Sequence, residues 1–406
     1  MSNDRQRRVA VVTPWYPEAQ IPFRGSFVRA MVEAVAPECA DLTVYHLSIW
    51  TVVRPAARRA AVWEAQRLLL PRSIPPIADG AGATLYRIPT MTPPTEDWRV
   101  KSDEFASWLT VALDGRPIEA PVVHAHVPIT AGYAALQNCR PDAKVFATEH
   151  SSFLADILAQ DGARERYDEI LHRLTGFFAV GEPMREMIAE TFPHHADKIR
   201  LIANPIDFRA SRRRPPETLR RWLSVSSLTE RKRIDHLIRG FALCLADDPR
   251  LTLTLVGDGA ERAELEALAA ELGVAEAIDF RGAVEPDAIG GIMADHDLLV
   301  HTSRHETFGM VVVEALAAGI PVLVTRCGGP QHALEGVEAA AGHFIDVDDD
   351  PAVLAKGYDE LVGRYPHDVD LGRARSHLEE RYGHAAVAAQ HHRAWDLAAE
   401  NEERDR

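Results

Sequence analysis

Two glutamates and a glycine lie close together near residue 300, where a strand, a loop and a helix follow one another. Residues 298–301 have the composition of a buried strand, a polar loop continues to Thr307, and Phe308 and Gly309 precede an apolar helix. A helix that begins after such a loop presents unpaired backbone N–H groups and the positive end of its dipole. Gly309 lets a ligand approach this backbone closely. The stretch therefore predicts a site for an anion such as a diphosphate.

The two glutamates of this stretch are candidates for binding a hydroxylated ligand. Glu306 lies in the loop and Glu314 in the helix, with seven residues between them, so both can border one ligand without forming an adjacent acid–base pair. Carboxylates are strong acceptors for the hydroxyls of a sugar or a ribose. Solvent-exposed glutamates occur at this spacing by chance as well. However, Glu314 lies between Val313 and Ala315 in an otherwise apolar helix, so we expect it to have a dedicated partner.

Three histidines in the first half of the chain follow or end predicted strands. His124 and His126 lie in VVHAHV and His150 lies in TEHSSF. Ligands of parallel α/β sheets bind beyond the carboxyl ends of the strands, so these histidines are candidates for substrate contact. His126 is a candidate for lining a ligand pocket. A structural role is the alternative for each of them, and zinc ligation by the first two is another, although no third ligand is apparent.

Both halves of the chain alternate short β-type runs with helical stretches, which is the pattern of an α/β protein with parallel sheets. Arg-rich and Pro-rich residues 212–216 have the composition of a linker between the halves. A final Ala-rich helix is expected at 385–403, and its docking partner cannot be read from periodicity. The predicted strands are residues 9–12, 42–46, 122–125, 144–148, 177–180, 222–226, 251–256, 277–280, 298–301 and 321–324.

Composition and charge limit the classes of function. The 406 residues are 46% apolar and 26% charged, which is a globular composition with room for two domains. A net charge of −15 argues against nucleic acid as a main partner. The first apolar run ends at Val12, too short for a signal peptide or a membrane span, so we expect a cytoplasmic protein. Neither disulfides nor a CxxC zinc site is expected of the widely spaced Cys39, Cys139, Cys244 and Cys327.

Residues 50–72 carry five arginines among apolar residues, as a membrane-surface helix does. Arginine stems lying over an ordinary packed helix explain the same pattern, and Pro55 and Pro71 limit the length of any helix there. Peripheral membrane contact is therefore an alternative that we do not favour.

The segment HETFGMVVVEALAAGIPV at 305–322 resembles the signature of family 4 of the retaining glycosyltransferases, the glycosyl transferases group 1. The resemblance covers nearly the whole chain, because further matching segments at family-like spacing are PWYPEAQIPFRGSFV at 14–28, TEHSSF at 148–153, ANPID at 203–207, SSLTERKRIDHLI at 226–238 and LVGDG at 255–259. It implies the α/β GT-B fold, in which two Rossmann-like domains face each other across a cleft. The implied parts are an acceptor-binding domain at 1–205, a nucleotide-sugar-binding domain at 206–384, and a C-terminal helix and charged tail at 385–406 that can cross back to the first domain.

The resemblance also implies a role for each matching residue. Glu306 contacts hydroxyls of the donor sugar, Glu314 contacts the ribose, and the charge of Lys232 stabilises the leaving nucleotide without a metal. Backbone groups near Gly282 read the base. The implied catalytic residues are Glu306, His150 and Lys232; the implied donor-binding residues are Gly25, Lys232, Phe308, Gly309, Met310, Glu314 and Gly282; and His126 is the candidate for the acceptor.

The implied activity is transfer of a hexose, with retention of configuration, from a nucleotide-diphosphate sugar to an acceptor hydroxyl by a front-face displacement. We expect a UDP-sugar, with GDP- and dTDP-linked sugars as alternatives, and we expect no metal and no further cofactor. The acidic run at 346–350 looks like the metal-binding motif of a different glycosyltransferase fold, but Pro351 follows it, so Asp350 is predicted to be a helix N-cap. The acceptor and the oligomeric state are not predicted.

One position departs from the family pattern. The family usually has arginine five residues before the conserved lysine, and this chain has Ser227 there. Arg231 and Arg233 flank Lys232, and either is a candidate to supply the charge. The departure keeps two alternatives open, a related nucleotide-sugar epimerase or hydrolase and a non-catalytic nucleotide-sugar-binding protein.

Overall fold

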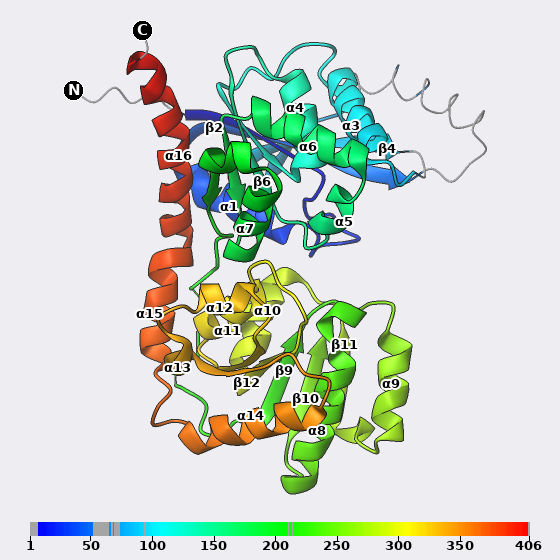
Figure 1. Ribbon diagram of the computed structural model, residues 1–406, viewed down its shortest axis with the longest axis vertical. Coiled ribbons are helices and arrows are strands. Elements are labelled where there is room, and N and C mark those ends of the chain that lie inside the picture. The colour runs from blue at the N-terminus through cyan, green and yellow to red at the C-terminus, as the bar shows by residue number, and fades with distance from the viewer. Residues whose placement is uncertain are drawn as a thin grey trace. The chain divides into compact units, whose positions relative to one another are not determined.

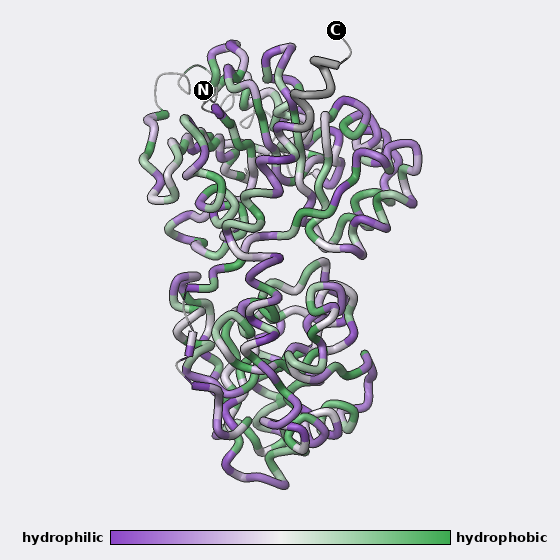
Figure 2. The backbone as a smooth tube through the Cα atoms, turned by 90° about the vertical axis from the view of Figure 1, so that its left-hand side faces the viewer, coloured by the Kyte–Doolittle hydropathy of each residue, from purple (hydrophilic) through white to green (hydrophobic). Residues whose placement is uncertain are grey.

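The computed structural model describes residues 7–51, 65, 68, 74–92, 95–209, 211–212 and 214–404. These residues fold into two compact units (Figure 1). The first unit lies within residues 1–180, 184–205 and 387–406, and the second within residues 181–183 and 206–386. Hydrophobic and hydrophilic stretches alternate along the backbone of both units (Figure 2), as expected of buried strands that alternate with half-buried helices.

The first unit is built on an eight-stranded sheet in the order β3-β4-β2-β1-β5-β6-β7-β8, parallel except for the pair β3 and β4. The central strand β1 reads as a continuous apolar run because helices cover both faces of such a sheet. The strands are β1 (Arg7–Thr13), β2 (Cys39–Thr51), β3 (Ile77–Asp79), β4 (Ala83–Thr92), β5 (Val122–His126), β6 (Lys144–Glu149), β7 (Gly176–Ala179) and β8 (Ile199–Leu201).

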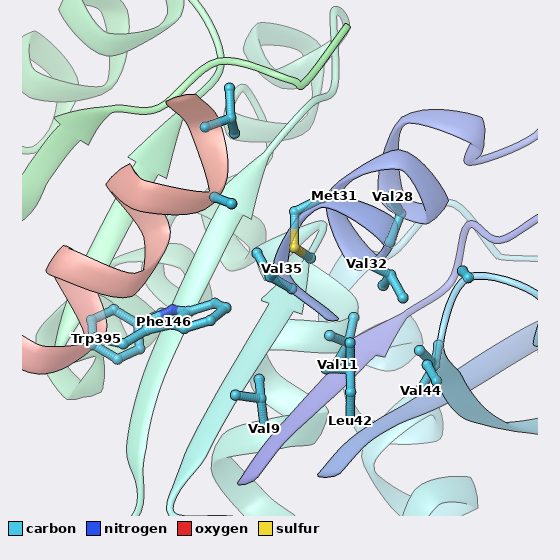
Figure 3. Packing of buried hydrophobic residues seen from close by; sticks show 14 of the residues in the cluster. Val9, Val11, Val28, Met31, Val32, Val35, Leu42, Val44, Phe146 and Trp395 are labelled. Atoms are coloured by element: carbon cyan, nitrogen blue, oxygen red, sulfur yellow. The ribbon is translucent and has the colours of Figure 1, made fainter. Parts of the chain in front are cut away.

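The last helix of the chain packs on this first sheet. Trp395 is buried in the same hydrophobic cluster as Phe146 of β6 and Val9 of β1 (Figure 3). The docking partner that periodicity could not give is thus the first unit. The helices here are α1 (Ser26–Val35), α3 (Trp98–Ala112), α4 (Tyr133–Asn138), α5 (Leu154–Leu158), α6 (Asp161–Arg173), α7 (Glu182–Thr191) and α16 (His384–Arg404), with short helical turns η1 (Ala36–Glu38), η2 (Pro128–Gly132) and η3 (Pro193–Lys198).

The second unit is built on a six-stranded parallel sheet in the order β11-β10-β9-β12-β13-β14. Its strands are β9 (Arg221–Val225), β10 (Thr252–Val256), β11 (Ile278–Gly282), β12 (Leu298–His301), β13 (Val322–Thr325) and β14 (Gly342–Ile345). Its helices are α8 (Ile234–Asp247), α9 (Arg262–Glu271), α10 (Pro286–Ala294), α11 (Met310–Ala318), α12 (Gly329–Ala333), α13 (Glu338–Ala341), α14 (Pro351–Arg364) and α15 (Leu371–Tyr382), with the turns η4 (Glu230–Lys232) and η5 (Ala275–Ala277).

The predicted α/β class is confirmed, and each predicted strand overlaps an observed one. The N-cap prediction is confirmed too, because the Asp350 side chain accepts a hydrogen bond from the Ala352 N–H. Four strands were not predicted, namely β3, β4, β8 and β14. Pro89 obscures β4 in the sequence, yet it fits there because β3 pairs only with residues 83–85 and leaves that edge of β4 uncovered farther along.

The stretch at 50–72, for which membrane contact was the alternative that we did not favour, lies outside the described residues, apart from positions 50, 51, 65 and 68. Within the part of the chain that is described, no helix combines the length and the hydropathy needed to cross a bilayer.

Candidate active site

The loop between β12 and α11 has the geometry that the sequence predicted. Gly309 has a φ of 83° and directly precedes the first residue of α11. A Cβ atom at this position would lie 2.7 Å from Cγ of Pro330, so both the backbone conformation and the space require glycine. At the other end of the helix, Gly319 has a φ of 86° and forms the expected cap.

A buried ion cluster forms around Glu306 in this loop. Its Oε1 atom lies 2.5 Å from Nζ of Lys232 and 3.2 Å from Nε2 of His301, while Nη1 of Arg231 lies 3.6 Å from Oε2. Only 11% of the Glu306 side chain and 13% of the Lys232 side chain are exposed. Burial acts to raise the pKa of Glu306, but the hydrogen bond from His301 and the charge of Lys232 outweigh it and hold the pKa well below its usual range. The structure thus brings together a carboxylate and an ammonium from distant parts of the sequence.

Two loops hold this cluster in place through backbone contacts. The Thr302 hydroxyl donates to the backbone carbonyl of Lys232 at 3.0 Å, and the Arg304 N–H donates to the carbonyl of Arg231 at 2.9 Å. On the other side of Glu306, its N–H donates to the carbonyl of Cys327 at 2.9 Å. Glu306 and Lys232 therefore face each other because hydrogen bonds join the loops that carry them, and these loops follow neighbouring strands of one sheet.

The structure distinguishes the two arginines that flank Lys232. Arg233 turns away, with its guanidinium 2.8 Å from Oδ1 of Asp349 and only 5% of its side chain exposed. Arg231 points into the cluster and also donates to the carbonyl of His305 at 2.7 Å. Ser227 is exposed. Of the two candidates to replace the family's arginine, Arg231 is the one placed beside the ion cluster.

Glu314 has no hydrogen-bond or ion-pair partner for its side chain among the residues that the structure describes, so the expected partner is not one of them. Burial raises the pKa of Glu314 to about 7. Burying an unpaired carboxylate is costly, but the raised pKa lets the group be buried as the neutral acid without a charged partner. The carboxyl group is therefore available to a ligand.

Gly282 ends β11 and has a φ of 78°. Its carbonyl accepts a hydrogen bond from the N–H of Gly257 at 2.8 Å, which joins the ends of β10 and β11. The guanidinium of Arg281 is paired with Asp279 at 2.8 Å. The Gly282 backbone therefore shapes this turn, and the side chain of Arg281 is occupied by its ion pair.

The first unit holds a separate group of histidines at the ends of β5 and β6. Nδ1 of His126 lies 2.8 Å from Nε2 of His150, and the His150 ring packs on Phe27 with 4.4 Å between centroids. The His126 ring is also stacked on His124, 4.9 Å away, and only 1% of His126 is exposed. Burial lowers the pKa of His150 to about 3, so these rings are neutral near pH 7. His126 therefore contacts another histidine where the sequence analysis placed an acceptor.

Gly25 precedes α1 in the same unit and has a φ of 72°. A Cβ atom there would lie 2.3 Å from the backbone carbonyl carbon of Trp15. No side chain fits this position, so glycine is required where α1 begins against the backbone of Trp15.

A cavity of about 310 Å³ opens at the carboxyl ends of the strands of the first unit. Its aromatic wall comes from Trp15, Trp98 and Phe153. Among the described residues, the basic one in its lining is Lys101, whose Nζ lies 4.0 Å from the centre of the Trp98 ring. Val127, the neighbour of His126, also lines it. The cavity offers apolar ring surfaces and one ammonium group.

Sequence reasoning missed two of these features. Glu149 is buried and accepts hydrogen bonds from the backbone N–H groups of His150 and Ser151, each at 2.8 Å, and from the Tyr167 hydroxyl at 2.9 Å. It thereby fixes the backbone that carries His150. The pairing of Lys101 with Trp98 had a usable signal, because residues three apart on a helix are neighbours. Tyr167 and Glu149 are eighteen positions apart and carried no such signal.

Comparison with known proteins gives consistent matches over most of the chain. The family model described as Glycosyltransferase Family 4 matches residues 67–210, and the one described as Glycosyl transferases group 1 matches residues 207–376. A GDP-mannose-dependent alpha-mannosyltransferase of Mycolicibacterium smegmatis is 26% identical over 301 residues, which cover 70% of this chain and 72% of that protein. A D-inositol 3-phosphate glycosyltransferase of Streptomyces avermitilis is 29% identical over 72% of this chain and 60% of its own length.

Solved structures agree on the fold. Anabaena Alr3699/HepE in complex with UDP superposes with a TM-score of 0.69 at 16% identity, covering 96% of this chain and all of that one. The sucrose-phosphate synthase from Thermosynechococcus elongatus superposes with a TM-score of 0.72 at 18% identity, covering 96% of this chain and 99% of that one. At this identity the likeness concerns the two-domain architecture.

Proposed function

Because the chain belongs to the group 1 glycosyltransferases and has their GT-B fold, we propose that it transfers a hexose from a nucleotide-diphosphate sugar to an acceptor hydroxyl with retention of configuration. The observation that carries the proposal is the buried pair of Lys232 and Glu306 beside the first turn of α11. An ammonium, a carboxylate and a helix N-terminus match the phosphates and hydroxyls of such a donor.

The donor replaces the contact between Lys232 and Glu306. The diphosphate binds Nζ of Lys232 and the backbone of Phe308, Gly309 and Met310, and the freed carboxylate of Glu306 accepts hydrogen bonds from the sugar hydroxyls. The two groups are matched in charge before the donor arrives, which avoids a buried unpaired charge in the empty site. Glu314 accepts from the ribose, and the turn at Gly282 meets the base.

The transfer is a front-face displacement. The bond between the anomeric carbon and the diphosphate oxygen breaks, and the nucleoside diphosphate leaves with the electron pair. Lys232 stabilises the negative charge that develops on this leaving group, aided by Arg231 in the place of the family's arginine. The acceptor oxygen bonds to the same face of the sugar, and its proton passes to the departing phosphate oxygen. Neutral His150 hydrogen-bonds to the sugar, and His126 holds its ring in position.

The cavity in the first unit supports a proposal for the acceptor. Trp15 and Trp98 offer flat apolar surfaces for a ring, and Lys101 offers a cation. We therefore assign this cavity to an acceptor that carries a ring and an anionic group, a phosphate or a carboxylate. Lys101→Met should raise the KM for such an acceptor about tenfold and leave the KM for the donor unchanged.

For the donor, we propose a UDP-hexose. HepE binds UDP in the structure that this chain resembles, whereas the mycolicibacterial relative is GDP-mannose-dependent. Thermal-shift binding of UDP, GDP and dTDP decides between them, because a ligand that binds only the folded state raises Tm. We expect UDP to give the largest shift, and Lys232→Ala and Glu314→Ala to abolish it. Lys356→Ala, which removes an exposed lysine on α14, is the matched control.

The outcomes of this test separate the alternatives. A shift with GDP alone would change the donor and keep the site. No shift with any of the three nucleotides would overturn the proposal. A nucleotide sugar that is bound but consumed without an acceptor would indicate an epimerase or hydrolase, and one that is bound and never turned over would indicate a binding protein.

A further inference from the structure

The first unit carries a second cluster of potential ligand atoms, formed by Asp168, His194 and His195. Oδ1 of Asp168 lies 2.7 Å from Nε2 of His194 and 3.1 Å from Nε2 of His195. One ligand atom from each residue fits within a span of 4.8 Å. We infer that these three side chains bind one divalent transition-metal ion, with zinc the best fit. No metal was expected from the sequence, and a metal ion at this place is independent of the proposed transfer reaction.

The chemistry of the three side chains selects the class of ion. Two imidazoles and one carboxylate are a common ligand set for zinc, which bonds to such nitrogen and oxygen atoms at about 2.0–2.2 Å. Magnesium and calcium prefer sites made of oxygen atoms alone. A tetrahedral ion has room for a fourth ligand, either water or His172, which lies one turn after Asp168 on α6 and whose ring centroid is 6.2 Å from that of His195.

Packing on both sides of the cluster holds its two elements together. Asp168 belongs to α6, and the two histidines belong to the turn η3 that leads into β8. On one side, the rings of Tyr167 and Phe192 are stacked with 5.6 Å between centroids. On the other side, Nζ of Lys198 donates to three backbone carbonyls at the end of α6, at 2.8–3.2 Å. The ligand atoms are therefore brought close by contacts that do not depend on the metal.

The charges around the cluster also suit a cation. The carboxylate of Asp168 is the anionic group of the cluster, and it contacts both histidines. The cation that faces the cluster is Lys198, and its ammonium is engaged by the carbonyls of α6. The two histidines share one carboxylate oxygen of Asp168 as hydrogen-bond acceptor. A bound ion takes the place of both hydrogen bonds and clips α6 to the segment before the edge strand β8.

Calorimetric titration of the tag-free, full-length protein with zinc chloride tests the inference. Metal ions bind deprotonated ligands, so the titration is run at about pH 7.5, where we expect one saturable equivalent. His194→Ala should weaken binding by about tenfold or more, and it should fold normally because 59% of that side chain is exposed. Asp168→Asn should weaken binding similarly while it keeps a polar partner for the histidines. His367→Ala, at an exposed histidine of the second unit, should bind zinc as the unaltered protein does.

The same titrations contain the results that would overturn the inference. These are the absence of saturable binding to the unaltered protein, full affinity in His194→Ala, or an equal loss in His367→Ala, which would mean that zinc binds surface histidines at random. A thermal melt of each variant without metal checks folding. Without zinc, His194→Ala should melt at the Tm of the unaltered protein. If it then lacks the rise in Tm that zinc causes in the unaltered protein, the ion binds where we place it.

Discussion

Both units place ionisable side chains beyond the carboxyl ends of the strands in their sheets. These side chains are charged in the second unit and neutral in the first. In the second unit, Lys232 and Glu306 are buried as an ion pair, and their contact holds the carboxyl group ionised. In the first unit, His126 and His150 are buried without a charged partner at the ring atoms that face each other, and burial keeps both rings neutral. A site for a diphosphate needs fixed positive charge, whereas a neutral imidazole can hydrogen-bond to a hydroxyl group of a sugar without adding a buried charge.

The difference in charge also predicts how strongly a substitution in each pair of residues affects the protein. Removing one member of an ion pair leaves the other charge buried and unpaired, which is costly. Removing one ring of a neutral pair loses a hydrogen bond and packing, which costs less. Substitutions in the second unit should therefore have larger effects on activity than substitutions among the histidines of the first unit.

The largest effect is expected from Lys232→Ala. It removes the charge that stabilises the leaving diphosphate and leaves Glu306 without its ammonium partner. We expect kcat to fall by about 10²–10³, the usual loss when one group that stabilises developing negative charge is removed. Steady-state kinetics with a saturating donor measures it, and Lys356→Ala controls for loss of a surface lysine. A loss of less than about threefold would remove the contrast between the two units.

Acid should act mainly on the first unit. In the unfolded chain a histidine titrates near pH 6.5, while burial lowers the pKa of His150 and of His391 on α16 to about 3. Between these values the unfolded chain binds more protons, so the free energy of unfolding falls as the pH falls. Below pH 6.5, each such imidazole lowers the free energy of unfolding by about 1.4 kcal/mol for every pH unit. At pH 5 the loss is about 2 kcal/mol for each imidazole.

His391→Phe isolates this effect because His391 packs on Phe178 and His124 and needs no hydrogen bond for that packing. The variant should lose less stability between pH 7 and pH 5 than the unaltered chain, by about 2 kcal/mol. Urea unfolding at the two pH values gives the difference. An unchanged pH dependence, with His367→Ala as the exposed control, would show that α16 does not remove this ring from water.

A smaller effect should come from the pair His126 and His150. We expect His150→Ala to lower kcat/KM about tenfold and His126→Asn about fivefold, since the second acts by holding the first in position. The double variant should be no worse than His150→Ala, because both changes remove one interaction. If the losses in kcat/KM of the two single variants multiply in the double variant, the two residues are not coupled. Equal UDP binding in all three variants would show that the donor site is intact.

The sequence predicted the second unit more completely than the first. The strand, loop and helix from Leu298 to Gly319 lie within one short segment, so local patterns located the loop, the glycine cap and both glutamates. The family resemblance pointed to Lys232 and Glu306 individually, but their contact with each other and the contact of Glu306 with His301 were not predicted. In the first unit the features depend on residues far apart in the chain, such as Glu149 with Tyr167 and His124 with His391, and no local pattern reports them.

Glu314 gives the smallest and most specific prediction, because it is the one site carboxyl in the second unit whose state of charge resembles that of the neutral first unit. Burial raises its pKa to about 7, so in the empty site it is protonated below that pH and ionised above it. A ribose hydroxyl donates more strongly to the carboxylate than to the carboxylic acid. The KM for the donor should therefore fall by about threefold as the pH rises from 6 to 8, since the proton must leave before the stronger contact forms. Glu314→Gln cannot ionise and should show a flat profile over this range, with a KM near the value that the unaltered enzyme has at pH 6. If both enzymes show the same pH dependence, the titrating group lies elsewhere, and Glu314 belongs with the permanently charged residues around Lys232.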